Sequence, residues 1–87
     1  MENIAQSSPI VIRKNAREEL RLSVDEYHGY PFASFRVWYR DDDSGEMRPS
    51  RKGLTVSPDN WPLFIAGLRR LEGELQQRGL LEGDTDL

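Results

Sequence analysis

The chain has 87 residues, of which 37% are hydrophobic and 31% charged, and it contains no cysteine. This length allows one small domain, and the lack of cysteine excludes disulfides, thiol nucleophiles and thiolate metal sites. No apolar run approaches the ~18 residues of a membrane-spanning helix, and the N-terminal "MENIAQSSPI" lacks the basic start and apolar core of a secretory signal. We therefore expect no membrane partner and a cytoplasmic location, associated with the nucleoid if the source is prokaryotic.

The formal charge of −3 argues mildly against a nucleic-acid partner, but the charge is unevenly distributed. Residues 11–58 hold nine Arg and Lys against eight acids, whereas residues from 59 onward hold three Arg against six acids. The excess negative charge thus belongs to the C-terminal third. Because charges more than about 8–10 Å apart are screened at physiological salt, the local balance matters more to a ligand than the total.

The first half of the chain predicts an arm followed by two strands. Residues 1–17 are expected to form a flexible arm, in which the "IVI" run is a weak candidate for an extra strand. From Glu19 onward, Leu20, Leu22 and Val24 alternate with polar residues, as in a half-buried strand. The segment "YHGYP" is typical of a turn, and "FASFRVWYR" predicts a second strand rich in aromatic and β-branched residues.

The second half predicts a loop, more extended structure and a helix. "DDDSGE" consists of turn formers. "MRPSRKGLTV" reads as extended chain in which Pro49 and Gly53 force a break or a bulge that could divide it into two short strands. A helix should begin between Ser57, a good N-cap, and Asn60, and stop at Gly79. The predicted organisation is an arm at 1–17, a domain at 18–78 and an acidic tail at 79–87.

Strands followed by one helix predict an α+β fold, with an antiparallel sheet and the helix on one of its faces. A helix of about 20 residues is roughly 30 Å long, but four strands side by side span only about 19 Å. The apolar stripe of the helix would therefore overhang the sheet, and a second copy of the chain is the simplest cover. We expect a homodimer through this stripe, which comprises Trp61, Phe64, Ile65, Leu68, Leu71 and Leu75.

The solvent-facing side of the second strand has the composition of a nucleic-acid surface. Strict alternation places Arg36, Trp38 and Arg40 on one face and an apolar set that includes Tyr39 on the other. Guanidinium groups bind phosphates and an aromatic ring stacks on a base, which is how proteins hold single strands without sequence preference. The alternative is that Trp38 is partly buried, with the arginine side chains lying along it.

Two segments give the chain a family resemblance. "LSVDEYHGYPFASFRVWY" and "GEMRPSRKGLTVSPDNW" resemble the DNA-binding domain of the transcriptional positive cofactor four family, which groups a eukaryotic coactivator with prokaryotic relatives. The second segment is the more specific, and the match covers residues 22 to about 68. The resemblance implies a curved four-stranded antiparallel sheet followed by one helix, dimerisation through the helices, and binding of single-stranded or melted DNA.

The resemblance also implies residue roles, with Tyr27 and Tyr39 as stacking rings and Arg36, Arg48 and Lys52 at phosphates. The chain departs from the family at positions 28 and 30, where lysines can occur, and at Asp25, where an arginine can occur. The loop "RDDDSGE" is one residue longer than in the eukaryotic relative. Pattern and resemblance together predict nucleic-acid contacts at Arg21, Tyr27, His28, Tyr30, Arg36, Trp38, Tyr39, Arg40, Arg48, Arg51 and Lys52.

Trp38 and Tyr39 are adjacent, so both can face DNA only if the strand bulges or twists between Arg36 and Tyr39. The neighbouring "GEMRPSRKG" is expected to return from a hairpin tip and to place its cations beside this aromatic strand.

Other functions have less support. The single histidine, His28, has no partner at a spacing that would orient it as a base, and no nucleophile or phosphate-binding motif is present, so we expect no enzyme and no cofactor. "DDDSGE" does not follow the order of a calcium loop, so we expect no metal. A module that docks onto the transcription machinery is the serious alternative to binding of single-stranded DNA, with RNA as a further candidate ligand.

Overall fold

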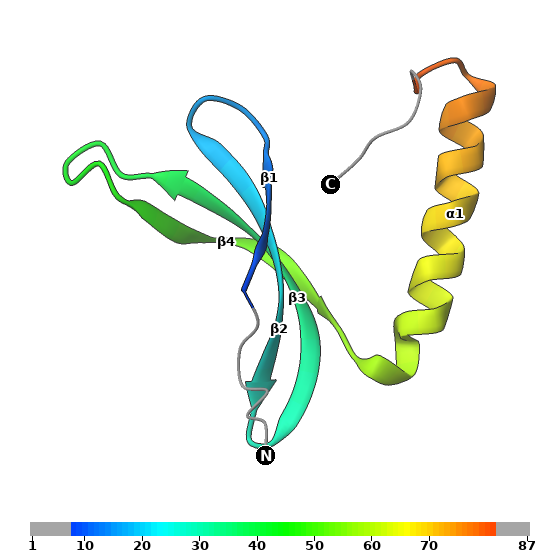
Figure 1. The fold of residues 1–87 in the computed structure, drawn as a ribbon, viewed down its shortest axis with the longest axis horizontal. Coiled ribbons are helices and arrows are strands. Elements are labelled where there is room, and N and C mark those ends of the chain that lie inside the picture. Colours follow the sequence, from blue (N-terminus) through cyan, green and yellow to red (C-terminus); the bar gives the residue numbers. More distant parts are fainter. Residues whose placement is uncertain (1–7, 82–87) are drawn as a thin grey trace.

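The structure, a computed structural model, describes residues 8–81 as one antiparallel sheet followed by a helix (Figure 1). Each strand pairs with the next along the chain, in the order β1-β2-β3-β4. This arrangement confirms the predicted α+β fold. The elements are β1 (Ile10–Arg13), β2 (Glu18–Tyr27), β3 (Tyr30–Arg40), β4 (Met47–Val56), a 3₁₀ turn η1 (Pro58–Asn60) and α1 (Trp61–Gln77).

Strand β1 lies within the segment predicted to be a flexible arm. It pairs with β2 so that Ile10 lies opposite Leu22 and Ile12 opposite Leu20. These pairs place both isoleucines on the same face of the sheet as the apolar positions of β2. The "IVI" run is therefore part of the first strand of the sheet, so the segment 10–13 is not a flexible arm. Residues 1–7 of the predicted arm and 82–87 of the predicted tail lie outside the described residues.

Strand β4 is continuous: of the break or bulge expected at Pro49 and Gly53 the structure has the bulge, and it does not divide the segment into two strands. Arg36 pairs with Gly53 and Trp38 with Pro49, so three residues of β4 lie opposite the single residue Val37 of β3. The Ser50 hydroxyl donates a hydrogen bond of 2.7 Å to the carbonyl of Val37 and thereby holds this bulge against its neighbour. Pro49 and Gly53 mark the two ends of the bulge rather than the ends of strands.

The helix begins and ends where the local sequence signals lie. Pro62 is in the first turn of α1, where a missing backbone N–H costs little because that group has no partner within the helix. At the other end Gly79 has φ +70°, and the N–H groups of Gly79 and Leu80 donate to the carbonyls of Gln76 and Leu75. These two bonds form a Schellman motif, which confirms the predicted stop at Gly79.

Helix α1 extends away from the sheet instead of lying along it (Figure 1). Its first turn contacts the sheet through Phe35, whose ring centroid lies 6.4 Å from that of Trp61 and 5.4 Å from that of Phe64. Further along, Leu68 and Leu71 are 43% and 57% exposed. Even more of the apolar stripe is thus uncovered than the length argument predicts. No helix within residues 8–81 is long and apolar enough to cross a membrane.

The described part of the chain has almost no interior of its own. Among residues 8–81, only Val56 and Ser34 are buried, at 9% and 6% exposed. The radius of gyration is 15.5 Å, compared with the roughly 12 Å expected of a compact 87-residue domain. The fold is therefore an open framework whose apolar surfaces still lack a cover.

Among the six glycines in the described part of the chain, Gly53 is the one where an added side chain would meet close neighbours. A Cβ at residue 53 would lie 2.5 Å from the backbone carbonyl oxygen of Phe35, which cannot move without disturbing the β3–β4 pairing. We expect Gly53→Ala to lower the free energy of unfolding by about 1–3 kcal/mol, measured by thermal or urea denaturation at fixed protein concentration.

Gly73→Ala is the matched control for this prediction. A Cβ at Gly73 meets nothing within 4 Å, and alanine is the better helix former by about 0.5–1 kcal/mol. Equal stability of the two variants would contradict the close approach at Gly53.

Candidate nucleic-acid interface

The pairing of β2 with β3 divides their side chains between two faces. It runs without interruption from Glu18 opposite Tyr39 to Tyr27 opposite Tyr30, so side chains alternate strictly along both strands. One face is apolar and meets the start of α1 through Phe35. We call the other the open face; it contains Arg21, Ser23, Asp25, Ser34, Arg36 and Trp38.

The open face is hollowed at its centre. These six residues, with Pro9 and Pro49, line a depression with a volume of about 330 Å³. Ser34 forms part of its floor, since it is only 6% exposed. The depression therefore combines cationic, anionic, hydroxyl and aromatic groups within one shallow site.

Arg21 and Trp38 form a stacked pair at one end of this hollow. The Arg21 Cζ atom lies 3.9 Å from the centroid of the indole ring, within the range of a cation–π interaction. The Nε atom of Arg21 also contacts the Glu19 carboxylate at 2.6 Å. The guanidinium plane is thus held over one face of Trp38, and a planar guanidinium is itself a surface on which bases stack.

A hydrogen bond to the bulge of β4 orients the Arg36 side chain. Its Nη1 atom donates a hydrogen bond of 2.9 Å to the carbonyl of Ser50, at the start of the three-residue bulge of β4. A guanidinium has five N–H donors, so this bond orients the side chain and leaves other donors for a ligand. The bulge thereby positions a cation in the hollow.

Exposed rings lie at the end of the β2–β3 hairpin, on the same face. His28 and Gly29 both have positive φ, as in the tight two-residue turns that suit the twist of a hairpin. Tyr27 and Tyr30 face each other across this end and are 68% and 76% exposed. Eight residues of extended strand, roughly 26 Å, separate Tyr30 from Trp38, so aromatic rings flank the hollow at both ends.

Two predicted contacts do not share this face. Tyr39 lies opposite Arg48 in the β3–β4 ladder, and both belong to the apolar side of the sheet. The bulge does not bring Tyr39 round to Trp38, because the extra residues are in β4 and the pairing of β3 with β2 stays regular. The two adjacent rings therefore lie on opposite faces of the sheet, and the roles of Tyr39 and Arg48 stay untested.

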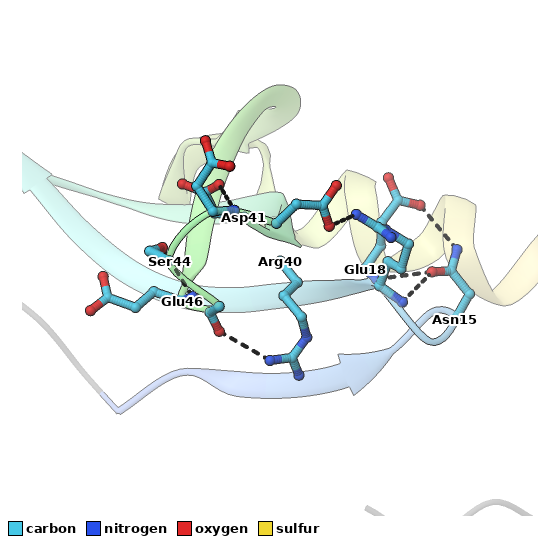
Figure 2. A network of polar contacts seen from close by, with 10 residues as sticks. Asn15, Glu18, Arg40, Asp41, Ser44 and Glu46 are labelled. Atoms are coloured by element: carbon cyan, nitrogen blue, oxygen red, sulfur yellow. Dashed lines mark hydrogen bonds and ion pairs between the residues drawn. The ribbon is translucent and has the colours of Figure 1, made fainter.

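Several other cations are engaged by the two loops at the end of the sheet opposite the hairpin (Figure 2). The Arg40 side chain donates to the Gly45 carbonyl at 3.0 Å, and its backbone N–H donates to the Arg17 carbonyl at 2.9 Å. Arg17 in turn pairs with Asp42. These bonds tie the β1–β2 turn to the β3–β4 loop and leave Arg40 less available than the strand pattern predicts.

The remaining predicted cations lie in the bulge. Arg51 and Lys52 are exposed, and the positive charge of Lys52 contributes to lowering the pKa of Glu18, after larger effects from Asn15 and Lys14. Within residues 8–81, no group of three or more histidines or acids is arranged to hold a metal ion.

Asp41 carries a perturbed carboxylate at the base of the acidic loop. The backbone N–H of Asp43 donates to it at 2.9 Å, and the Nε atom of Arg48 lies 2.6 Å from its other oxygen. Both bonds favour the ionised form and lower the pKa of Asp41, the one from Asp43 most. Because the folded pKa is depressed, Asp41 stabilises the folded state at neutral pH, and this contribution is lost as the pH falls through the depressed pKa.

Replacing Arg48 by Ala should raise the pKa of Asp41 only part of the way to its ordinary value, since the Asp43 N–H remains. A pH titration of the Asp41 side-chain carboxyl carbon by NMR measures this change. Arg51→Ala removes the same charge from the same strand without touching Asp41 and should leave its titration unchanged. A shift of equal size in both variants would refute a specific contact with Arg48.

Comparison with known proteins identifies the family. The sequence matches the family described as "Transcriptional Coactivator p15 (PC4)" over residues 14–67. It is 34% identical over 56 residues to a Caenorhabditis elegans protein named "Putative RNA polymerase II transcriptional coactivator". This alignment covers 64% of the present chain and 42% of the relative, so the chain spans less than half of that protein's length.

Solved structures show the same fold. The chain superposes on a PC4 homolog from Burkholderia pseudomallei with a TM-score of 0.67 at 24% identity, over 83% of this chain and 96% of the homolog. It also superposes on the bacteriophage T5 homolog of the coactivator, described as implicated in recombination-dependent DNA replication, with a TM-score of 0.59 at 26% identity, over 83% and 90% of the two chains. The resemblance read from the two sequence segments is thus confirmed, and the chain belongs to the PC4 family of transcriptional coactivators.

Proposed function

We propose that the chain binds single-stranded or melted DNA as a homodimer, through the open face of its sheet. Membership of the PC4 family supports nucleic acid and the transcription machinery as partners. The observation that carries the proposal is the grouping of Arg21, Trp38 and Arg36 on an uncovered sheet face, with Tyr27 and Tyr30 further along it.

Each group on the open face has a part in holding a single strand. The arginines contact phosphates, and the rings, or the guanidinium stacked on Trp38, provide flat surfaces for unpaired bases. Each stacked base contributes roughly 1–3 kcal/mol whatever its identity. A duplex keeps its bases stacked inside, so this surface favours unpaired strands.

Trp38→Leu should weaken binding to a fluorescein-labelled dT12 oligonucleotide by between roughly fivefold and a hundredfold, because one stacking surface is lost. Fluorescence anisotropy at low ionic strength measures the affinity. Tyr39→Leu is the matched control, since it removes an adjacent ring from the opposite face and should leave the affinity within about twofold. A larger loss from Tyr39→Leu than from Trp38→Leu would move the DNA path to the other face.

Salt dependence separates this function from its rival, a protein-docking module without a DNA ligand. Phosphate binding releases counterions, so log affinity should fall against log salt with a slope of about −0.7 for each phosphate neutralised on a single strand. A docking surface built on apolar contacts would respond little. Titration of single-stranded DNA, duplex DNA and a single-stranded RNA at two ionic strengths also ranks the three ligands.

The homodimer is supported by the uncovered stripe of α1. Leu68, Leu71 and Leu75 are 40–57% exposed on one side of a helix that stands apart from its own sheet. At about 25 cal/mol per Å² of apolar surface, covering such a stripe is a substantial stabilisation for a chain with so little interior. A second copy of the same helix offers a complementary apolar surface through a two-fold interface.

Light scattering should therefore give about twice the chain mass of 10.1 kDa, and Leu71→Glu should shift the protein towards monomer by placing a charge in the stripe. Glu74→Gln changes a neighbouring charged residue of the same helix and is expected to leave the mass at the dimer value. A monomeric wild-type protein at micromolar concentration would overturn the dimer while leaving the open face unaffected.

A further inference from the structure

Asp25 puts a negative charge on the surface that we propose binds a polyanion. It lies on the open face, in the hollow shared with Arg36 and Trp38, and the resemblance to the family allows an arginine at this position. None of the four ion pairs among residues 8–81 includes Asp25. A carboxylate there repels phosphates, so its presence calls for a ligand group that donates hydrogen bonds.

We infer that the hollow is a site for a single guanine base, with Asp25 as the residue that selects it. This inference rests on the proposed function and adds a base preference to a contact that is otherwise independent of sequence. Its volume of about 330 Å³ lies at the lower end of the ~300–1,000 Å³ typical of small-ligand sites, which suits one base better than two.

The carboxylate is oriented to receive a ligand. The Ser23 hydroxyl lies 3.2 Å from Oδ1 of Asp25 and holds the side chain from the neighbouring position on the same face. This bond engages one oxygen, so Oδ2 and the second lone pair of Oδ1 are left as acceptors. Ser34, in the floor of the hollow, adds a hydroxyl that can donate or accept.

Guanine has the edge that matches this arrangement. It offers two adjacent donors, the N1–H and the N2 amino group, which fit the two oxygens of one carboxylate. Its O6 and N7 atoms accept hydrogen bonds from arginine, and Arg36 projects into the same hollow. Unpaired bases in single strands are commonly recognised through these edges.

The other bases fit less well. Cytosine and adenine each offer a single amino group, so only one donor atom reaches the carboxylate. Thymine has one N–H between two carbonyl oxygens, both of which repel a carboxylate. Stacking on the Arg21–Trp38 pair is available to every base and does not distinguish among them.

The test compares labelled dT12 with dT12 carrying one central dG, dA or dC, by fluorescence anisotropy at a single salt concentration. The dG oligonucleotide should bind about five- to tenfold more tightly than dT12. The affinities of the dA and dC oligonucleotides should lie within about twofold of the affinity of dT12. A central inosine, which keeps N1–H but lacks the N2 amino group, should lose most of the gain.

Asp25→Asn should reduce the preference for dG to less than twofold while the affinity for dT12 is kept or increased, because a negative charge has been removed. Glu26→Gln is the matched control: it removes the same charge one residue away, on the opposite face, and should retain the full dG preference. Circular dichroism and thermal unfolding check that both variants are folded.

The outcomes separate the two ideas. Tight binding of dT12 with no gain from dG, or a gain that survives in Asp25→Asn, overturns the guanine site and leaves the proposed function standing. A failure of every oligonucleotide to bind overturns both.

Discussion

The uninterrupted hydrogen-bond ladder between β2 and β3 is the constraint on which the rest of the structure depends. Because ten consecutive residue pairs keep register, every side chain on these strands is assigned to one of two faces. Leu20, Leu22, Val24, Phe35 and Val37 fall on one side, where Phe35 meets the first turn of α1, whereas Phe32 lies opposite Asp25 on the other. The arginines, the hydroxyls and Trp38 are thereby collected on the other. A shift of one residue would exchange the two sets.

The β2–β3 pairing stays regular in a curved sheet because the bulge lies in β4. Extra residues are placed in the edge strand, where they bend the sheet without disturbing the alternation at its centre. The same irregularity presents the Ser50 carbonyl that orients Arg36. A departure from regular pairing thus contributes directly to the candidate site.

Local patterns in the sequence were sufficient for much of this architecture. Alternation at Leu20–Val24, the turn at His28–Gly29 and the stop at Gly79 each rest on interactions between near neighbours, which a short window of sequence contains. Strand β1 was underestimated because four exposed residues carry little periodic signal, and their place is decided by pairing with β2. The choice between a break and a bulge in β4 was left open for a related reason. Pro49 and Gly53 are compatible with either a break or a bulge, and the choice depends on bonds to Val37, across the ladder.

The candidate site was predictable in composition and less so in arrangement. Alternation alone groups Arg36 with Trp38 and places Tyr39 on the other face, as the structure does, whereas only the register reveals that Arg48 lies opposite Tyr39 on that far side. The loop contacts of Arg17 and Arg40 depend on two turns meeting in space, which no spacing in the sequence encodes. The role proposed for Asp25 emerges only when its neighbours across the strands are known.

The detached position of α1 has a consequence for how much folded protein exists. In the proposed homodimer, a chain with only two buried residues in its described part gains part of its stability from the copy that covers its helix. Under mass action such a gain grows with the concentration of the covering molecule. Dilution would then unfold this protein, as heating unfolds a domain that is stable alone. The concentration of the protein would therefore also determine how quickly proteases degrade it.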